Sequence, residues 1–142
     1  MAAVIRCAAM AFVLSGTAVA APKAPPPPPR PAFTAVQAAQ GAQVYAGQCA
    51  MCHGHRLEGT LEIPALTGKF IANWAGRPLA DLPAYLVRAM PQFAPGSLPP
   101  EDAARLTAFI LSANGYAAGP TPFTSLTRVA LPPPPPLSQQ TR

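Results

Sequence analysis

Apolar and small residues recur every three or four positions over residues 35–48, which predicts an amphipathic helix there. The residues on this face are Ala38, Gly41, Ala42, Tyr45 and Cys49. Thr34 and Gln37 have the spacing of a capping box, in which side chains bond the free backbone N–H groups at a helix start. Glycine inside a helix costs about 1 kcal/mol relative to alanine. Gly41 therefore indicates that another helix backbone approaches closely there.

A second helix with the same spacing is predicted over residues 100–113. Pro100 suits its first position, and Glu101 and Asp102 suit the positive end of the helix dipole. The apolar stripe of this helix consists of Ala103, Leu106, Phe109, Ile110 and Ala113. Asn114-Gly115 is a C-cap signal, so the helix should end there.

A shorter helix is predicted over residues 81–89. Asp81 can cap it, and Met90-Pro91 ends it because the residue before a proline avoids the α region. Residues 54–79 are interrupted by glycine and proline, which predicts irregular chain with one short turn of helix. No stretch alternates between apolar and polar positions, so the expected fold class is all-α.

One short stretch, Cys49-Ala50-Met51-Cys52-His53, carries candidate chemistry. It reads C-x-x-C-H, the attachment sequence of c-type haem, in which Cys49 and Cys52 bond the porphyrin and His53 is the proximal iron ligand. The alternatives are half of a zinc site and a redox dithiol. A zinc site needs a second set of ligands at a matching spacing, but the remaining cysteine is Cys7. A thioredoxin-like dithiol would need a βαβ pattern around it, which is missing.

Met90 is the candidate for the sixth iron ligand, by elimination among the four methionines of the chain. Met1 and Met10 lie in the predicted leader, and Met51 is tethered between the two cysteines. His55 is also held on the proximal side, two residues after His53. Met90 lies far enough along the chain to cross the ring, and His/Met ligation is a recognised arrangement of haem c. The competing interpretation of Met90 is ordinary core packing.

Residues 1–20 have the pattern of a secretory signal peptide. Arg6 is followed by an apolar run from Cys7 to Leu14 and by the cleavage pattern Ala18-Val19-Ala20, so the mature chain should begin at Ala21. The run is too short to span a bilayer, and we expect no membrane span after cleavage. An uncleaved anchor is the alternative. Export implies the periplasm, where covalent haem attachment takes place in proteins of this kind.

Proline runs flank the predicted helical domain, which spans residues 34–119. Residues 21–33 contain Pro25 to Pro29, and residues 120–142 contain Pro132 to Pro136. Such runs favour an extended polyproline II arm. We interpret both as solvated tails outside the folded unit. The alternative is docking onto a partner with a groove for polyproline II.

The net charge of +5 comes from the ends of the chain. Between residues 34 and 119, five basic residues are balanced by five acidic ones. The excess lies at Arg6, Lys23, Arg30, Arg128 and Arg142. A nucleic-acid-binding domain would need a basic face on its folded part, so no nucleic-acid partner is expected.

These elements together resemble a bacterial class I (mitochondrial-type) mono-haem cytochrome c over roughly residues 37–115. The matching segments are Gly41-x-x-x-Tyr45, the haem motif through Gly54, Pro64-Ala65-Leu66, Met90-Pro91 and Leu106 to Leu111. The resemblance implies a cytochrome c-like fold whose first and last helices cross near Gly41, and one covalently bound haem c per chain. It also implies that Pro64 accepts the N–H of the proximal imidazole and that Leu66 lies beside the haem. The polar cap usual before the last helix is replaced by Pro99-Pro100.

A longer string from Phe70 and Trp74 through Met90 to Asn114-Gly115 looks like the small cytochromes that accompany periplasmic quinoprotein (PQQ) dehydrogenases. This implies a one-electron carrier or electron-transfer subunit, not an enzyme, that accepts electrons from a dehydrogenase and passes them towards a terminal oxidase. Trp74 would lie near the haem, bonding a propionate or packing. The alternative is a haem-based sensor or small peroxidase-like enzyme with an open iron position, for which Arg88 is the local distal candidate.

Overall fold

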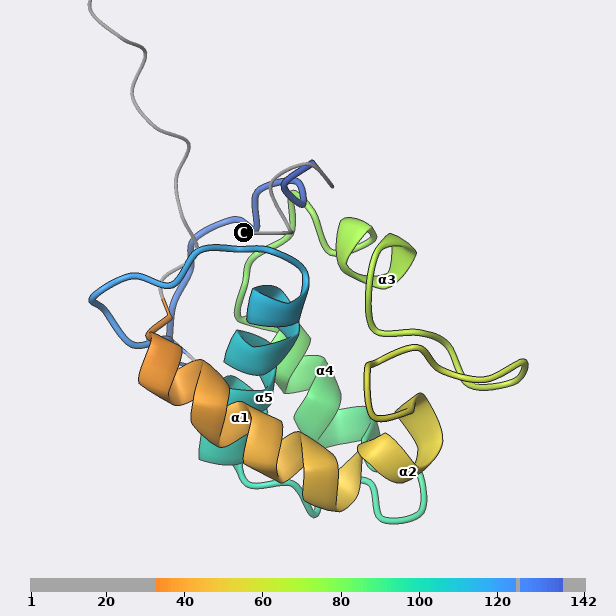
Figure 1. Ribbon diagram of the computed structural model, residues 1–142. Helices are drawn as coiled ribbons and strands as arrows, with labels where there is room; N and C mark the ends of the chain where they lie inside the picture. Colours follow the sequence, from red (N-terminus) through yellow and green to blue (C-terminus); the bar gives the residue numbers. More distant parts are fainter. Residues whose placement is uncertain (1–32, 125, 137–142) are drawn as a thin grey trace, which may run out of the picture.

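A computed structural model describes residues 33–124 and 126–136 of the chain. The predicted signal peptide and nearly all of the N-terminal arm lie outside these residues, as does the end of the C-terminal tail. The described part contains five helices, arranged as Figure 1 shows. They are α1 (Ala35–Gln48), α2 (Ala50–His53), α3 (Lys69–Ala72), α4 (Asp81–Ala89) and α5 (Pro100–Ala113). This part has no β-strand, only an isolated bridge between Pro78 and Ala130, so the all-α fold class is confirmed.

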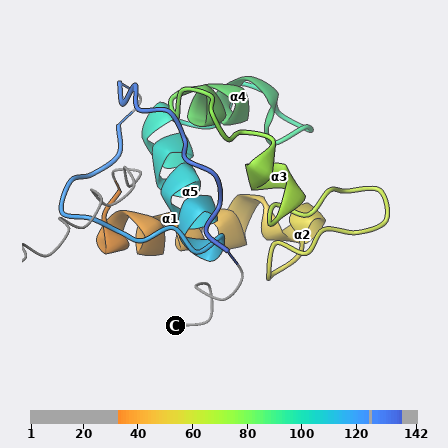
Figure 2. The same cartoon turned by 90° about the horizontal axis from the view of Figure 1, so that it is seen from above.

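Helices α1 and α5 cross, as the resemblance implied and Figure 2 shows. Their backbones approach closely at Gly41, where the sequence predicted a neighbouring helix. A Cβ atom on Gly41 would overlap the backbone carbonyl of Arg105 and lie 2.9 Å from the Cβ of Phe109. The rings of Tyr45 and Phe109 pack with their centroids 5.2 Å apart. The absent side chain is therefore what lets the two helix backbones approach.

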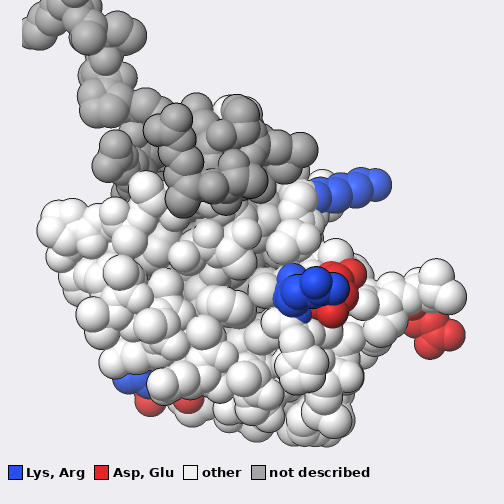
Figure 3. All heavy atoms as spheres, in the orientation of Figure 1, with Lys and Arg blue, Asp and Glu red and all other residues white. Residues whose placement is uncertain are grey.

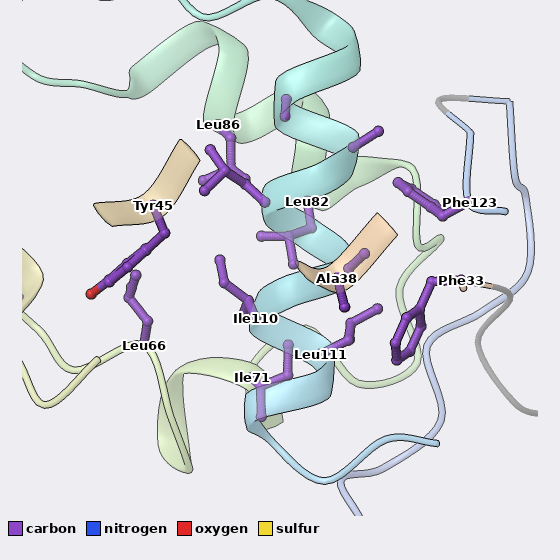
Figure 4. Packing of buried hydrophobic residues seen from close by; sticks show 14 of the residues in the cluster. Phe33, Ala38, Tyr45, Leu66, Ile71, Leu82, Leu86, Ile110, Leu111 and Phe123 are labelled. Atoms are coloured by element: carbon purple, nitrogen blue, oxygen red, sulfur yellow. The ribbon is translucent and has the colours of Figure 1, made fainter. Parts of the chain in front are cut away.

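The core lies between α1, α4 and α5, and Figure 4 shows its central side chains. Along α5 the buried residues are Ala103, Ala104, Leu106, Thr107, Ala108, Ile110 and Leu111. The one polar member, Thr107, satisfies its hydroxyl by donating to the carbonyl of Ala103 at 2.8 Å. Burial on nearly all sides explains why α5 carries a broader apolar face than a surface helix would need.

The ends of the predicted helices follow local signals closely. The Thr34 hydroxyl accepts from the N–H of Gln37 at 3.1 Å at the start of α1. Pro100 is the first residue of α5, as expected. The prediction that Asp81 caps α4 was wrong, because Asp81 is the first helical residue and pairs with Arg77 at 3.3 Å instead. Met90 follows α4 in extended backbone, so the proline signal that ended this helix is confirmed.

Both boundaries predicted for the folded domain need correction. Phe33, placed in the N-terminal arm, is fully buried, and its carbonyl accepts from the N–H of Gly119 at 2.7 Å. Residues 120–136 were predicted to be a solvated tail, yet Phe123 and Leu131 are each only 2% exposed. The Gln37 side-chain amide accepts from the N–H of Phe123 at 2.8 Å and donates to its carbonyl at 2.6 Å. Apolar side chains between the prolines therefore anchor this segment on the domain.

Within the described ranges, no helix is both long and apolar enough to cross a membrane. The folded unit instead consists of short helices around one core. One side of that core opens into a cleft between α2 and α4, where the predicted site residues gather.

Candidate functional site

A largely apolar cleft brings together most of the residues that the sequence singled out. Its lining includes Cys49, Cys52, His53, Pro64, Leu66 and Met90. These residues come from α1–α2, from the irregular chain after α2 and from the segment that follows α4. The cavity volume of about 260 Å³ lies just below the roughly 300–1,000 Å³ range of ligand clefts. Most of its wall is apolar, which suits a flat hydrophobic cofactor.

Helix α2 and Cys49, the residue just before it, present the two thiols and the imidazole of the C-x-x-C-H motif on the cleft wall. The turn from α1 into α2 occurs at Cys49, whose N–H bonds the carbonyl of Tyr45 at 2.9 Å. The carbonyl of Cys49 in turn accepts from the N–H of His53 at 2.9 Å. Burial raises the pKa of the Cys49 thiol to about 11, with a smaller contribution from Cys52. A redox dithiol needs a lowered pKa, so the Cys49 thiol lacks the activation that disulfide exchange requires.

The imidazole of His53 is held in one tautomer by the carbonyl of Pro64. The distance from Nδ1 to that oxygen is 2.9 Å. A carbonyl oxygen can only accept, so Nδ1 carries the proton and donates it. Nε2 then keeps its lone pair and can bind a metal, the arrangement in which a second bond fixes a ligating histidine and raises its basicity. This is the contact that the resemblance implied for Pro64.

A tight loop holds Pro64 in place. Gly59 has a positive φ of 69°, and its N–H donates to the carbonyl of His53 at 2.8 Å. A Cβ on Gly59 would lie 2.7 Å from the carbonyl carbon of Pro64, so a larger residue would push the loop away. Leu66 closes the loop by donating its N–H to Leu57 at 2.9 Å. The backbone hydrogen bonds of Gly59 and Leu66 thus hold the loop so that Pro64 stays beside His53.

Asn114 ties this loop to α5, a role that the sequence did not reveal. The side chain is only 3% exposed, and its amide donates to the carbonyls of Leu66 at 3.0 Å and Ile110 at 2.8 Å. Its oxygen accepts from the N–H of Gly68 at 2.9 Å. The sequence predicted Asn114 only as a helix C-cap. Its buried, fully bonded amide fixes the floor of the cleft to the last helix.

Tyr45 is a second site residue that the sequence placed only on a helix face. Its ring lines the cleft, and its hydroxyl donates to the carbonyl of Gly54 at 2.6 Å. Burial raises its pKa to about 12, and the neighbouring Cys49 and Glu58 add to the shift. The phenol therefore stays neutral over the physiological range. It holds the chain directly after His53 against α1.

Met90 lies on the α4 side of the same cleft as His53. Its side chain is half-buried, and the following residues Pro91, Gln92 and Phe93 also line the cleft. Among the residues lining the cleft, His53 is the one histidine and there is no arginine. Apart from Cys49 and Cys52, Met90 is the one residue of this lining with a sulfur donor.

Trp74 does not line the cleft, although the resemblance placed it near the haem. It packs behind two aromatic residues that do, with ring centroids 6.3 Å from Phe70 and 5.6 Å from Tyr85. The guanidinium of Arg77 lies 4.5 Å from the Trp74 ring centroid. Trp74 thus supports the aromatic wall of the cleft from outside, and a bond to a propionate stays a prediction.

The donor set of the cleft fits a c-type haem. Two thiols at the required spacing share one wall with an imidazole whose Nε2 is free to bind iron. A thioether lies on another wall, and the remaining lining is mostly apolar and aromatic. No group of three or more His, Cys, Asp and Glu residues in the described ranges could hold a separate metal ion. The zinc alternative therefore finds no support there.

Comparisons with known proteins agree with this chemistry. Residues 36–110 match the family model described as cytochrome c oxidase, cbb3-type, subunit III. A chain in the crystal structure of the sulfane dehydrogenase SoxCD from Paracoccus pantotrophus has a similar structure, with a TM-score of 0.53 and 30% sequence identity. The match covers 72% of this chain and 56% of that one, so this chain spans little more than half of the SoxCD chain. A comparison with curated proteins gave no match. The chain belongs to the family of class I c-type cytochromes that this model describes, and it functions in electron transfer with a covalently bound c-type haem.

Proposed function

We propose that the chain is a periplasmic one-electron carrier or electron-transfer subunit whose haem is bonded to Cys49 and Cys52 and ligated by His53 and Met90. One observation carries this proposal. The bond from His53 Nδ1 to Pro64, 2.9 Å long, prepares Nε2 as a ligand in the same cleft that Met90 lines. When bound, the haem supplies reversible one-electron exchange between ferric and ferrous iron.

The residues of the chain account for the rest of the function. Pro64 orients the imidazole and raises its basicity through the Nδ1–H bond. Met90 would fill the sixth position of the bound haem and leave no place on the iron for a substrate, and a thioether there raises the reduction potential. Leu66 and Leu86 line the cleft and would give the bound haem an apolar surface.

A sensor or peroxidase-like enzyme would need an open sixth position with a distal His or Arg aimed at it. Arg88, the candidate from the sequence, is exposed, and its guanidinium lies 5.9 Å from the Tyr85 ring centroid. It is not among the residues that line the cleft. His55 does not line it either. The carrier proposal therefore accounts for the cleft better than the enzyme alternative.

The surface suits brief contacts with redox partners. Charged residues are sparse on the face shown in Figure 3, and between residues 34 and 119 they cancel. Met51, next to both cysteines, and Phe93, on the cleft wall, expose large apolar side chains. A small apolar contact without strong charge pairing favours fast release, which electron carriers need.

We propose a dehydrogenase as electron donor and a terminal oxidase as the end of the pathway. The related SoxCD chain comes from a sulfane dehydrogenase, and the matched family model is named for an oxidase subunit. Both names support a place between a dehydrogenase and an oxidase. A quinoprotein dehydrogenase as the donor rests on the sequence resemblance alone.

Covalent attachment should be visible in the intact mass of protein exported to the periplasm. We expect the mass of the polypeptide from Ala21 onward plus one haem, and haem that stays with the protein in acidified organic solvent. The Cys49→Ser, Cys52→Ser double variant should release its haem under the same conditions. Haem extracted from the wild-type protein would contradict the attachment.

Ligand binding and electron counting test the carrier proposal itself. A reductive titration should take up one electron per chain. The reduced protein should bind CO slowly, and the oxidised protein should not turn over peroxide with an aromatic donor, because Met90 blocks the iron. Fast CO binding or sustained peroxide turnover by the wild-type protein would favour the sensor or enzyme alternative.

A further inference from the structure

The chain that leads into α4 is irregular, and the short helix before it makes few contacts with the other helices. In the described part, α1 packs on α5 and on α2, and α4 packs on α5, but no helix packs extensively on α3. Residues 73–80, which join α3 to α4, are irregular. Because α4 leads directly into Met90, contacts that fix the start of α4 also bear on the position of Met90.

A short segment near the C-terminus supplies such contacts. We call residues 129–132 the C-terminal brace; they run beside the connection between α3 and α4, as Figures 1 and 2 show. The carbonyl of Leu131 accepts from Gly76 and its N–H donates to Arg77, both at 2.8 Å. The carbonyl of Val129 accepts from Leu79, also at 2.8 Å. Three backbone bonds therefore join the brace to the connection.

The side chain of Leu131 adds a buried anchor to these bonds, since it is only 2% exposed. At the other end of the brace, the Tyr116 hydroxyl donates to the carbonyl of Pro132 at 2.8 Å. Tyr116 directly follows the Asn114-Gly115 end of α5. The brace thus links the end of α5 to the entry of α4, and it lies beyond residues 36–110 that match the family model.

A row of buried leucines extends from the connection along α4 to the cleft. Leu79, which bonds the brace, is buried, as are Leu82 and Leu86 on α4. Leu86 lines the cleft one turn before Met90. A shift at Leu79 would therefore be passed along α4 towards Met90, because a close-packed interior transmits strain.

We propose that the C-terminal brace holds α4 so that Met90 stays on the haem iron, with Leu131 as the positioning residue. This rests on the proposed ligation by Met90. Without the anchor, α4 should detach locally more often, because segments with few packing contacts open before the whole domain unfolds. Each opening would release Met90 while His53 and the two thioether bonds keep the haem in place.

The test is the rate of CO binding to the reduced full-length protein, well below its unfolding temperature. CO can bind only while Met90 is off the iron, so the rate reports the open fraction. In Leu131→Ala we expect a rate at least about tenfold higher than in the wild type, since a buried leucine is lost. In ferric Leu131→Ala, the weak far-red band that reports the bond from sulfur to iron should also be lost on heating. The loss should come at a lower temperature than the loss of the helical circular dichroism signal.

Two controls on the same segment separate positioning from general stability. Leu126→Ala removes a leucine that is 78% exposed and should change nothing. Phe123→Ala removes a buried ring beside α1 and should lower the unfolding temperature without raising the CO rate. If Leu131→Ala does not fold, Leu131→Val should show a smaller rise in the same direction.

The outcomes distinguish the two proposals. Slow CO binding by the wild type together with an unchanged rate in a folded Leu131 variant would overturn the brace alone. An equal rise in Phe123→Ala and Leu131→Ala would also overturn it, because the effect would then be general. Fast CO binding by the wild type would overturn ligation by Met90, and the positioning role with it.

Discussion

Replacing Met90 by alanine should open the sixth coordination position of the haem and leave the fold intact. The weak sulfur-to-iron band of the ferric protein in the far red should vanish, and the midpoint potential should fall because a thioether favours ferrous iron. CO binding to the reduced variant should be about a hundredfold faster or more, as expected if Met90 leaves the iron less than about 1% of the time. Absorption spectra, a redox titration and stopped-flow mixing with CO measure these three effects.

Met51→Ala is the matched control, since it removes the other methionine of the described chain. Met51 is 78% exposed and lies between the two cysteines, so it cannot reach the opposite face of the ring. Its loss should leave the band, the potential and the CO rate unchanged. If Met90→Ala behaves like Met51→Ala, Met90 is not the ligand, and the sensor or enzyme alternative gains.

The helices could be predicted because their signals are local. The Thr34 cap, the proline at the start of α5 and Pro91 after α4 each act on neighbouring backbone, and the structure places the three long helices at the expected residues. Gly41 predicted a contact with a distant part of the chain, because a glycine that destabilises its own helix indicates a close neighbour. That neighbour, the backbone of Arg105, lies on α5.

The proximal side of the site was predictable for a different reason. Cys49, Cys52 and His53 act as one short motif, since haem attachment fixes their spacing. The bonds of Asn114 to Leu66 and Gly68 join residues far apart in the chain, and no local pattern marks such a pairing. An asparagine before a glycine predicts a helix end whether or not its side chain also bonds a distant loop.

The C-terminal segment shows how composition can mislead. Prolines lack an N–H, so a proline-rich stretch was expected to stay solvated. Its attachment to the domain comes from the residues between and beside the prolines, above all Phe123 and Leu131. Leu131 stands directly before the run from Pro132 to Pro136, and Phe123 follows Pro122. An apolar residue beside a proline indicates docking only when the surface that receives it is known.

Alanine at Gly41 should destabilise the folded protein strongly. The new Cβ would overlap the carbonyl of Arg105 and crowd Phe109, so α1 and α5 would have to separate. Backbone atoms cannot rotate away as a side chain can. We expect a loss of about 3 kcal/mol or more in the free energy of unfolding, at the upper end for overpacked cores. Urea unfolding of the haem-loaded protein, followed by far-UV circular dichroism, measures this loss.

Gly47→Ala is the matched control, because Gly47 lies on the same helix and nothing is within 4 Å of the position its Cβ would take. There the methyl group should stabilise the protein by about 0.5–1 kcal/mol, since alanine favours the helix and restricts the unfolded chain. The two variants thus add the same methyl group to one helix with opposite expected signs. Equal stability of Gly41→Ala and Gly47→Ala would mean that α1 and α5 do not cross at Gly41, and the Tyr45–Phe109 contact beside it would then be in doubt as well.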